Sequence, residues 1–172
     1  MNVRRREQVF TFVALSLILM SIMGCARGST EAVEAPDFSL PDLNGDVLSL
    51  RDFRGKPVIL VFWRVNCPSC EYQMPFLQAF YEKWSSDKVV LITVNVGEPA
   101  GLVGEYVSTH GLTFPVLLDT RQGVAQNYGV IGVPFTFFID DGGMLRAYRV
   151  GPFQDREAIE KAVKTVFPGL EM

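Results

Sequence analysis

A continuous apolar run that leads into a closely spaced cysteine pair constrains the fold of this chain most. Residues 57–63 (PVILVFW) carry no charge, as is typical of a strand buried on both faces of a sheet. The motif Cys67-Pro68-Ser69-Cys70 comes next, and beyond it apolar side chains recur every three or four residues, which predicts a helix. Two cysteines three apart at a helix start can close a small disulfide ring. Cys67 would stand near the helix N-terminus, where unpaired amides and the helix dipole favour a thiolate.

This placement predicts different roles for the two cysteines. We expect Cys67 to be the attacking thiolate and Cys70, one turn into the helix and more buried, to be the resolving thiol. Arg64 is a candidate for assisting the thiolate, although an exposed arginine just before a loop is more often only solvated. Pro75 lies inside the helix, where it removes an amide donor and crowds the carbonyl of Glu71.

Other uses of the cysteine pair fit the residues less well. A c-type haem site needs His directly after the second cysteine, where this chain has Glu71, and a zinc half-site lacks its other half. A copper site would have His110 alone to draw on, and we expect this His to cap a helix or lie at the surface. A purely structural disulfide would close a ring too small to stabilise the fold much.

The rest of the chain alternates strands with helices. Asn44-Gly45 and the segment 140–143 are turn signals, each between two short strands. We expect strands at 38–40, 47–50, 57–63, 89–94, 114–118, 135–139 and 144–150, and helices after Cys70, at 102–107, at 124–128 and from about Asp155. This order predicts an α/β fold: a central mixed sheet with helices on both faces.

The N-terminus has the pattern of an export signal rather than of a folded segment. Three arginines precede the uncharged run 9–23, which is short for a membrane-spanning helix. We expect residues 1–24 to be a lipoprotein-type signal peptide that ends at Cys25, the lipidated first residue. Ordinary cleavage after Ala26 and an uncleaved anchor remain alternatives. Residues 25–35 read as a flexible tether and residues 36–172 as the folded domain.

Composition excludes several classes of function. The net charge is −3 and the pI is near 5.2, whereas nucleic-acid binding calls for a basic face. Three cysteines are too few for a disulfide-rich scaffold. If Cys25 carries a lipid, one pair remains for an oxidising compartment.

Motifs along most of the chain resemble the thioredoxin superfamily and, within it, the TlpA/ResA-like extracytoplasmic thiol-disulfide oxidoreductases. The resemblance runs from about Ala35 to Pro168. Its motifs, in family order, are APDFSL at 35–40, LRDFRGKP at 50–57, FW at 62–63, CPSC at 67–70, MP at 74–75, FPVLLD at 114–119, YGV at 128–130, GVP at 132–134 and FFID at 137–140. It implies a thioredoxin-like three-layer fold with an N-terminal β-hairpin extension. It also implies that Pro134 is a cis-proline facing the disulfide, and that Val133 helps to hold an extended substrate segment beside Pro68 and Ser69.

Departures from the family pattern concern the surroundings of the cysteines. Asn66 stands where the family usually has Trp, Gln73 where it usually has Glu, and Val61 where it often has a buried Asn or Asp. In relatives the last two positions handle the proton of the buried thiol, and an amide cannot take up a proton near neutral pH. Gln73, Asn66 and Arg64 are therefore candidates for tuning the exchange, and Phe135 is bulky enough to alter the substrate groove. We favour drift within a tolerant family over a partly disabled enzyme.

The resemblance implies a monomeric enzyme, tethered to the membrane outside the cytoplasm, that exchanges the Cys67–Cys70 disulfide with protein thiols. It implies a reductant of the cytochrome c maturation type, fed by a membrane thiol carrier, with no cofactor or metal besides the cysteine pair. Two alternatives remain. A peroxiredoxin-like thiol peroxidase would carry Thr three residues before its reactive cysteine, where Arg64 precedes Cys67. A non-catalytic binding module would not need the intact CPSC motif.

Overall fold

A five-stranded mixed sheet forms the centre of the computed structural model, which describes residues 33–84 and 88–170. The strand order is β5-β4-β3-β6-β7; β5, β4 and β3 are parallel, and β6 and β7 are antiparallel to their neighbours. The strands are β3 (Val58–Trp63), β4 (Val90–Val96), β5 (Val116–Asp119), β6 (Phe135–Ile139) and β7 (Leu145–Val150). The helices are α2 (Pro68–Trp84), α3 (Ala100–Thr109), α4 (Gly123–Asn127) and α5 (Arg156–Val166).

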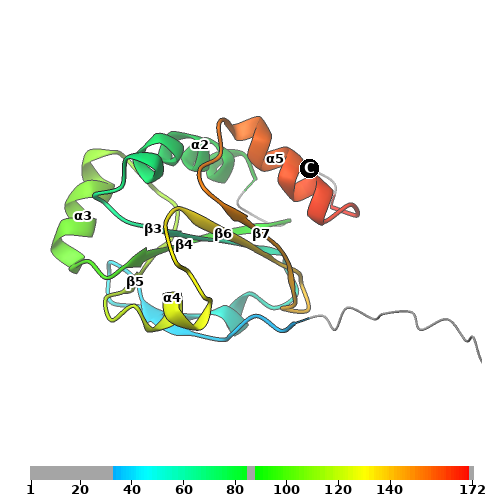
Figure 1. The fold of residues 1–172 in the computed structure, drawn as a ribbon, viewed down its shortest axis with the longest axis horizontal. Coiled ribbons are helices and arrows are strands. Elements are labelled where there is room, and N and C mark those ends of the chain that lie inside the picture. The colour runs from blue at the N-terminus through cyan, green and yellow to red at the C-terminus, as the bar shows by residue number, and fades with distance from the viewer. Residues whose placement is uncertain (1–32, 85–87, 171–172) are drawn as a thin grey trace, which may run out of the picture. The chain divides into compact units, whose positions relative to one another are not determined.

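The central strand β3 explains why both faces of the sheet are covered. All six of its side chains are buried, and alternate residues point to opposite faces. Ile59, Val61 and Trp63 belong to the core beneath α2, α3 and α5, and the other three pack with the layer that contains α4. Figure 1 shows these two layers on opposite sides of the sheet. The expected α/β architecture is confirmed.

An N-terminal extension crosses the face that carries α4. It contains the antiparallel hairpin of β1 (Ser39–Pro41) and β2 (Val47–Ser49), followed by the 3₁₀ helix η1 (Leu50–Phe53). It pairs with the β6–β7 turn through a bridge between Glu34 and Met144, and with β5 through one between Asp42 and Leu117. The extension therefore closes the second layer of the core, as Figure 1 shows below the sheet.

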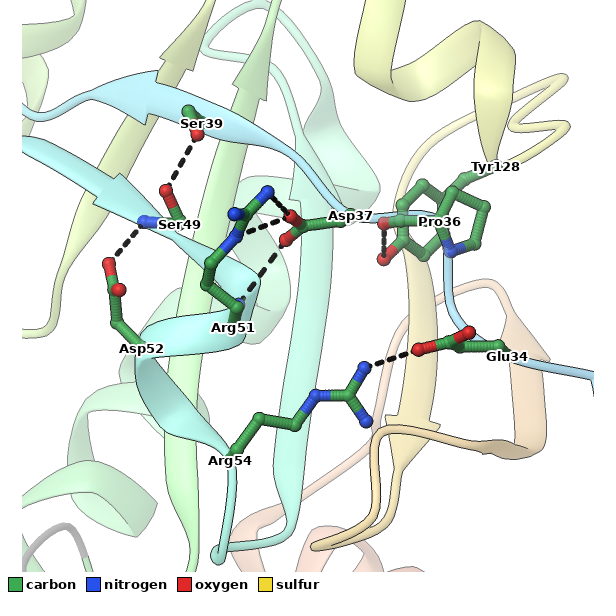
Figure 2. A network of polar contacts seen from close by, with 9 residues as sticks. All are labelled: Glu34, Pro36, Asp37, Ser39, Ser49, Arg51, Asp52, Arg54 and Tyr128. Atoms are coloured by element: carbon green, nitrogen blue, oxygen red, sulfur yellow. Dashed lines mark hydrogen bonds and ion pairs between the residues drawn. The ribbon is translucent and has the colours of Figure 1, made fainter.

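Polar contacts fasten the extension at its start (Figure 2). The Tyr128 hydroxyl donates a 2.7 Å hydrogen bond to the carbonyl of Pro36, and the carboxylate of Asp37 pairs with Arg51. Arg54 pairs with Glu34 at 2.6 Å. Burial raises the pKa of the Tyr128 phenol, so this hydroxyl remains a hydrogen-bond donor throughout the ordinary pH range.

Sequence and structure differ mainly at the boundaries of elements. The helix expected at 102–107 begins at Ala100 and ends at Thr109, and the strand expected at 114–118 begins at Val116. The export signal, Cys25 and most of the tether lie outside the described residues. Within residues 33–84 and 88–170, no helix is long and apolar enough to cross a membrane.

Candidate active site

The cysteine pair lies where β3 leads into α2. Cys67 is the residue before the first helical position, and its carbonyl accepts hydrogen bonds from the amides of Cys70 and Glu71, both at 2.9 Å. Pro68 takes the first helical position, where a missing amide hydrogen costs no helical bond. The amide of Cys70 also lies 3.2 Å from Cys67 Sγ and donates to it. The helix N-terminus thus presents a backbone donor directly to the sulfur of Cys67.

The two cysteines form a disulfide and differ in exposure. Their Cα atoms are 5.2 Å apart, within the usual range for a disulfide. Cys67 is half-buried and Cys70 is completely buried, while Pro68, Ser69 and Asn66 are exposed. A thiol partner can therefore reach the sulfur of Cys67, whereas Cys70 is shielded by the fold.

A second backbone segment lies against the disulfide. The Val133–Pro134 peptide bond is cis, and the carbonyl oxygen of Val133 lies 3.7 Å from Cys67 Sγ. The carbonyl of Pro134 accepts a 2.9 Å hydrogen bond from Gly151, which ties this segment to the end of β7. In the described part of the chain, the Val133 amide has no hydrogen-bond partner, so it is open to a partner strand.

Exposed apolar side chains flank these elements, and sequence reasoning missed them. Ile131, two residues before Val133, is 96% exposed. Val150, opposite Phe135 at the end of β7, is 63% exposed, and Tyr72 in the first turns of α2 is 50% exposed. Exposed apolar side chains on elements next to a reactive cysteine are consistent with a surface that contacts another protein.

Gln73 is completely buried in α2, one turn after Cys70. Its Oε1 accepts a hydrogen bond from the backbone amide of Phe153 at 3.3 Å, and its Nε2 has no partner among the described residues. Val61 is a completely buried residue of β3 that packs in the core. Neither position offers a titratable group to the buried thiol.

Arg64 does not behave as expected. It is half-buried rather than solvated, and its Nε donates a 2.8 Å hydrogen bond to the carbonyl of Val96 at the end of β4. This hydrogen bond holds the guanidinium at the end of β4. No contact between Arg64 and Cys67 is found among the described residues.

Glu98 is a functional candidate that sequence reasoning missed. Its Oε2 accepts hydrogen bonds from the amide of Val65 at 2.8 Å and from Nδ2 of the buried Asn95 at 2.7 Å. Glu98 therefore connects the end of β4 to the loop that leads to Cys67. The only sequence clue was its position just after a buried strand, next to a glycine.

Phe135, the residue after the cis-proline, has a buried ring. Its ring is stacked on Phe137 with centroids 4.8 Å apart and on Tyr148 at 5.6 Å, and it is 7% exposed. The Phe135 ring is therefore not exposed beside Pro134, and its effect on a substrate groove stays a prediction. Its side chain belongs to the core beneath the N-terminal extension.

His110 ends α3, as expected. The carbonyl of Tyr106 can only accept a hydrogen bond, so His110 Nδ1, at 2.8 Å, carries the proton. The His110 ring is also stacked on the Tyr106 ring. Across the described ranges, no three His, Cys, Asp or Glu side chains are grouped to hold a metal ion.

Comparisons with known proteins agree with this geometry. Residues 32–148 match the AhpC/TSA family. The chain is 33% identical to the thiol-disulfide oxidoreductase ResA of Geobacillus kaustophilus, over 96% of this chain and 99% of that one. It is 38% identical to ResA of Geobacillus thermodenitrificans, over 83% and 79% of the two chains. The crystal structure of StoA from Bacillus subtilis superimposes with a TM-score of 0.66 at 29% identity and covers 76% of this chain and 97% of that one.

Proposed function

Because the chain belongs to the AhpC/TSA family and is a thiol-disulfide oxidoreductase of the ResA-like group in the thioredoxin superfamily, we propose that it reduces disulfides of extracytoplasmic proteins from a membrane tether. Cys67 is the attacking residue and Cys70 the resolving one. The observation that carries this proposal is the Cys67–Cys70 disulfide at the start of α2, with Cys67 half-buried beside the Val133 carbonyl and Cys70 completely buried.

The reaction needs two displacement steps. The Cys67 thiolate attacks one sulfur of a client disulfide; that bond breaks, a mixed disulfide forms, and the released client thiolate takes up a proton. The Cys70 thiolate then attacks the sulfur of Cys67 and releases the second client thiol. Two electrons pass from the enzyme to the client. A membrane thiol carrier returns the enzyme to its dithiol form, and no cofactor beyond the cysteine pair takes part.

A reducing direction is supported by the lack of a cation bound at Cys67 among the described residues. A strongly oxidising pair has a specially stabilised reduced form. Among the described residues, the donor to Cys67 Sγ is the Cys70 amide at the helix N-terminus, and the nearest sequence candidate for a cation, Arg64, is bound to Val96. This arrangement favours a reductant, in line with a role in cytochrome c maturation.

The client binds as an extended segment beside the cis-proline. The open Val133 amide offers a main-chain hydrogen bond, and the exposed side chains of Ile131, Val150 and Tyr72 offer apolar contacts. Pro68 and Ser69, between the two cysteines, are exposed. The enzyme acts as a monomer, held at the membrane by a lipid on Cys25 or by its N-terminal segment.

Trapping and a redox titration test this proposal. With the full-length Cys25→Ser protein, Cys67→Ser is expected to abolish exchange, whereas adding Cys70→Ser instead is expected to trap a mixed disulfide with clients. The reduction potential of the parent protein, from alkylation after equilibration in thiol buffers, is expected near −270 mV or below. A potential near −120 mV would make it an oxidant. An inert pair would favour a binding module, and direct peroxide consumption would favour a peroxidase.

A further inference from the structure

A groove of about 520 Å³ lies along α2, begins next to the cysteine pair, and shares Tyr72 with the client contacts proposed above. It begins at Glu71, the residue after Cys70, and extends along the helix to Glu82. Its apolar lining includes Pro75, Ala79 and Leu112. A client segment that continues past Cys67 would therefore stay in contact with the protein in this groove.

The polar groups of this groove are mainly acceptors. Glu71 and Glu82 are exposed carboxylates, and neither Lys nor Arg lines the groove. The amide of Gln78 is already engaged: its Nε2 donates to Glu82 and to Thr113, and its Oε1 accepts from the Thr113 amide. The Nδ1 proton of His110, at the same rim, is used by the carbonyl of Tyr106.

Pro75 adds one more acceptor. An ordinary residue at this position would donate its amide hydrogen to the carbonyl of Glu71, four residues earlier, and proline has none. Both residues line the groove, so this carbonyl lacks its helical partner beside the apolar floor. The groove thus combines apolar surface with acceptors and negative charge.

We propose that this groove binds a cationic, apolar segment of the protein client, next to the cysteine that reacts with Cys67. The inference rests on the proposed function, because it assigns a substrate class to the same site. Charge complementarity selects the occupant: Lys or Arg side chains lay their methylene stems on apolar surface while their charged ends meet carboxylates. An acidic segment would meet repulsion from both glutamates.

The length of α2 sets the spacing that we expect between the positive charges of the client. Glu82 follows Cys67 by fifteen positions, which is about 22 Å along a helix at 1.5 Å per residue. Counted from the cysteine that reacts with Cys67, an extended client reaches Glu71 after about two residues and Glu82 after about seven. Clients with basic residues near these positions from their cysteine are therefore preferred.

Matched peptides test the proposal on full-length protein that carries Cys25→Ser. Each peptide has one cysteine linked to a chromogenic thiol, and apolar residues followed by lysine or by glutamate at about two and about seven positions, placed on either side of the cysteine. Release of the chromogenic thiol by the reduced enzyme gives a half-saturation concentration and a maximal rate. We expect a half-saturation concentration about three- to tenfold lower for the lysine peptide, from two exposed ion pairs. This difference should shrink as salt is added.

Charge reversal separates recognition from a general effect on the fold. Glu82→Lys is expected to raise the half-saturation concentration for the lysine peptide and to lower it for the glutamate peptide, which a loss of stability would not do. Glu105→Lys, exposed on α3 and outside the groove, is expected to leave the preference unchanged. Equal half-saturation for both peptides in the parent protein, or a preference that survives Glu82→Lys, overturns the inference.

Two further measurements separate the groove proposal from a failure of the proposed function and from self-association. Failure of the reduced parent protein to react even with a small symmetrical disulfide would count against the proposed function rather than against the groove. Sedimentation at the assay concentration checks for self-association. Dimers that disappear in Glu82→Lys would assign the groove to a second copy of the chain and overturn the client assignment.

Discussion

Replacing Gln73 by glutamate introduces a carboxyl group one turn after the buried Cys70, and the structure predicts its cost. Gln73 is completely buried, and its Nε2 has no partner among the described residues. The introduced carboxyl would keep the hydrogen bond from the Phe153 amide, now 3.3 Å from Oε1. Its second oxygen would replace the unpartnered Nε2, so the neutral acid fits the site about as well as the amide does.

Ionisation of the introduced carboxyl is unfavourable in the folded protein, because burial disfavours the charged form. Full burial raises the pKa of a carboxyl by up to about 3–5 units, and the Phe153 amide offsets part of this rise. We take a net rise of about two units, from about 4.3 in the unfolded chain to about 6.3 in the folded one. The unfolded chain then loses its proton first as the pH rises, so the folded state is destabilised between these values. The loss amounts to about 2.7 kcal/mol above pH 7 and is absent below pH 4.

Denaturant unfolding of the oxidised protein measures this loss. The free energy of unfolding of Gln73→Glu minus that of the parent should be near zero at about pH 4 and near −2.7 kcal/mol at about pH 8. Gln126→Glu, exposed on α4, is the matched control and should show no such trend. The same introduced carboxyl should add an inflection near pH 6 to the rate of disulfide exchange. If the free energy of unfolding of Gln73→Glu changes with pH as that of Gln126→Glu does, water reaches position 73 and our account of Gln73 is refuted.

Two further predictions concern carboxylates that hold neighbouring elements together. Glu98→Ala removes the acceptor of the Val65 amide, so it should slow disulfide exchange and lower the free energy of unfolding by about 1–3 kcal/mol. Glu98→Gln keeps an acceptor oxygen and should restore most of the exchange rate and most of the stability. Burial alone would raise the pKa of Glu160, but the hydrogen bond from Trp84 and the ion pairs with Lys83 and Arg156 outweigh it and hold this pKa below its usual value. Glu160→Gln should therefore lower the stability above about pH 5, and thermal unfolding at a series of pH values should show this difference vanish as the pH falls through the lowered pKa.

The sequence predicted those parts of the fold that depend on local pattern. The apolar run at 57–63 predicted a strand covered on both faces, and the structure buries every residue of β3. Asp155 was the expected start of the last helix, and its carboxylate caps α5 by accepting a 2.6 Å hydrogen bond from the Ala158 amide. Patterns of this kind involve residues close in the chain, so one sequence contains all the information they need.

Contacts between distant segments could not be predicted in this way. The side chain of Glu34, 20 residues before Arg54, is paired with it only because the extension folds back over the sheet (Figure 2). The carboxylate of Glu98 meets the Val65 amide only because β3 and β4 are parallel neighbours whose ends lie at one edge. Register and strand order decide such contacts, and neither can be read from periodicity.

The active site shows the same division. The placement of the CPSC motif after a buried strand and at a helix start predicted a reactive Cys67 and a shielded Cys70, because a helix start has its own electrostatics. The environment that tunes the pair comes from elsewhere: the Val133 carbonyl from the approach to β6, the Phe153 amide beside Gln73 from the approach to α5. Arg64 illustrates the consequence, since its charge next to the motif suggested help for the thiolate, yet the end of β4 holds its guanidinium. A charged residue near a motif in sequence acts on the site only if the fold leaves it no better partner, and here Val96 is that partner.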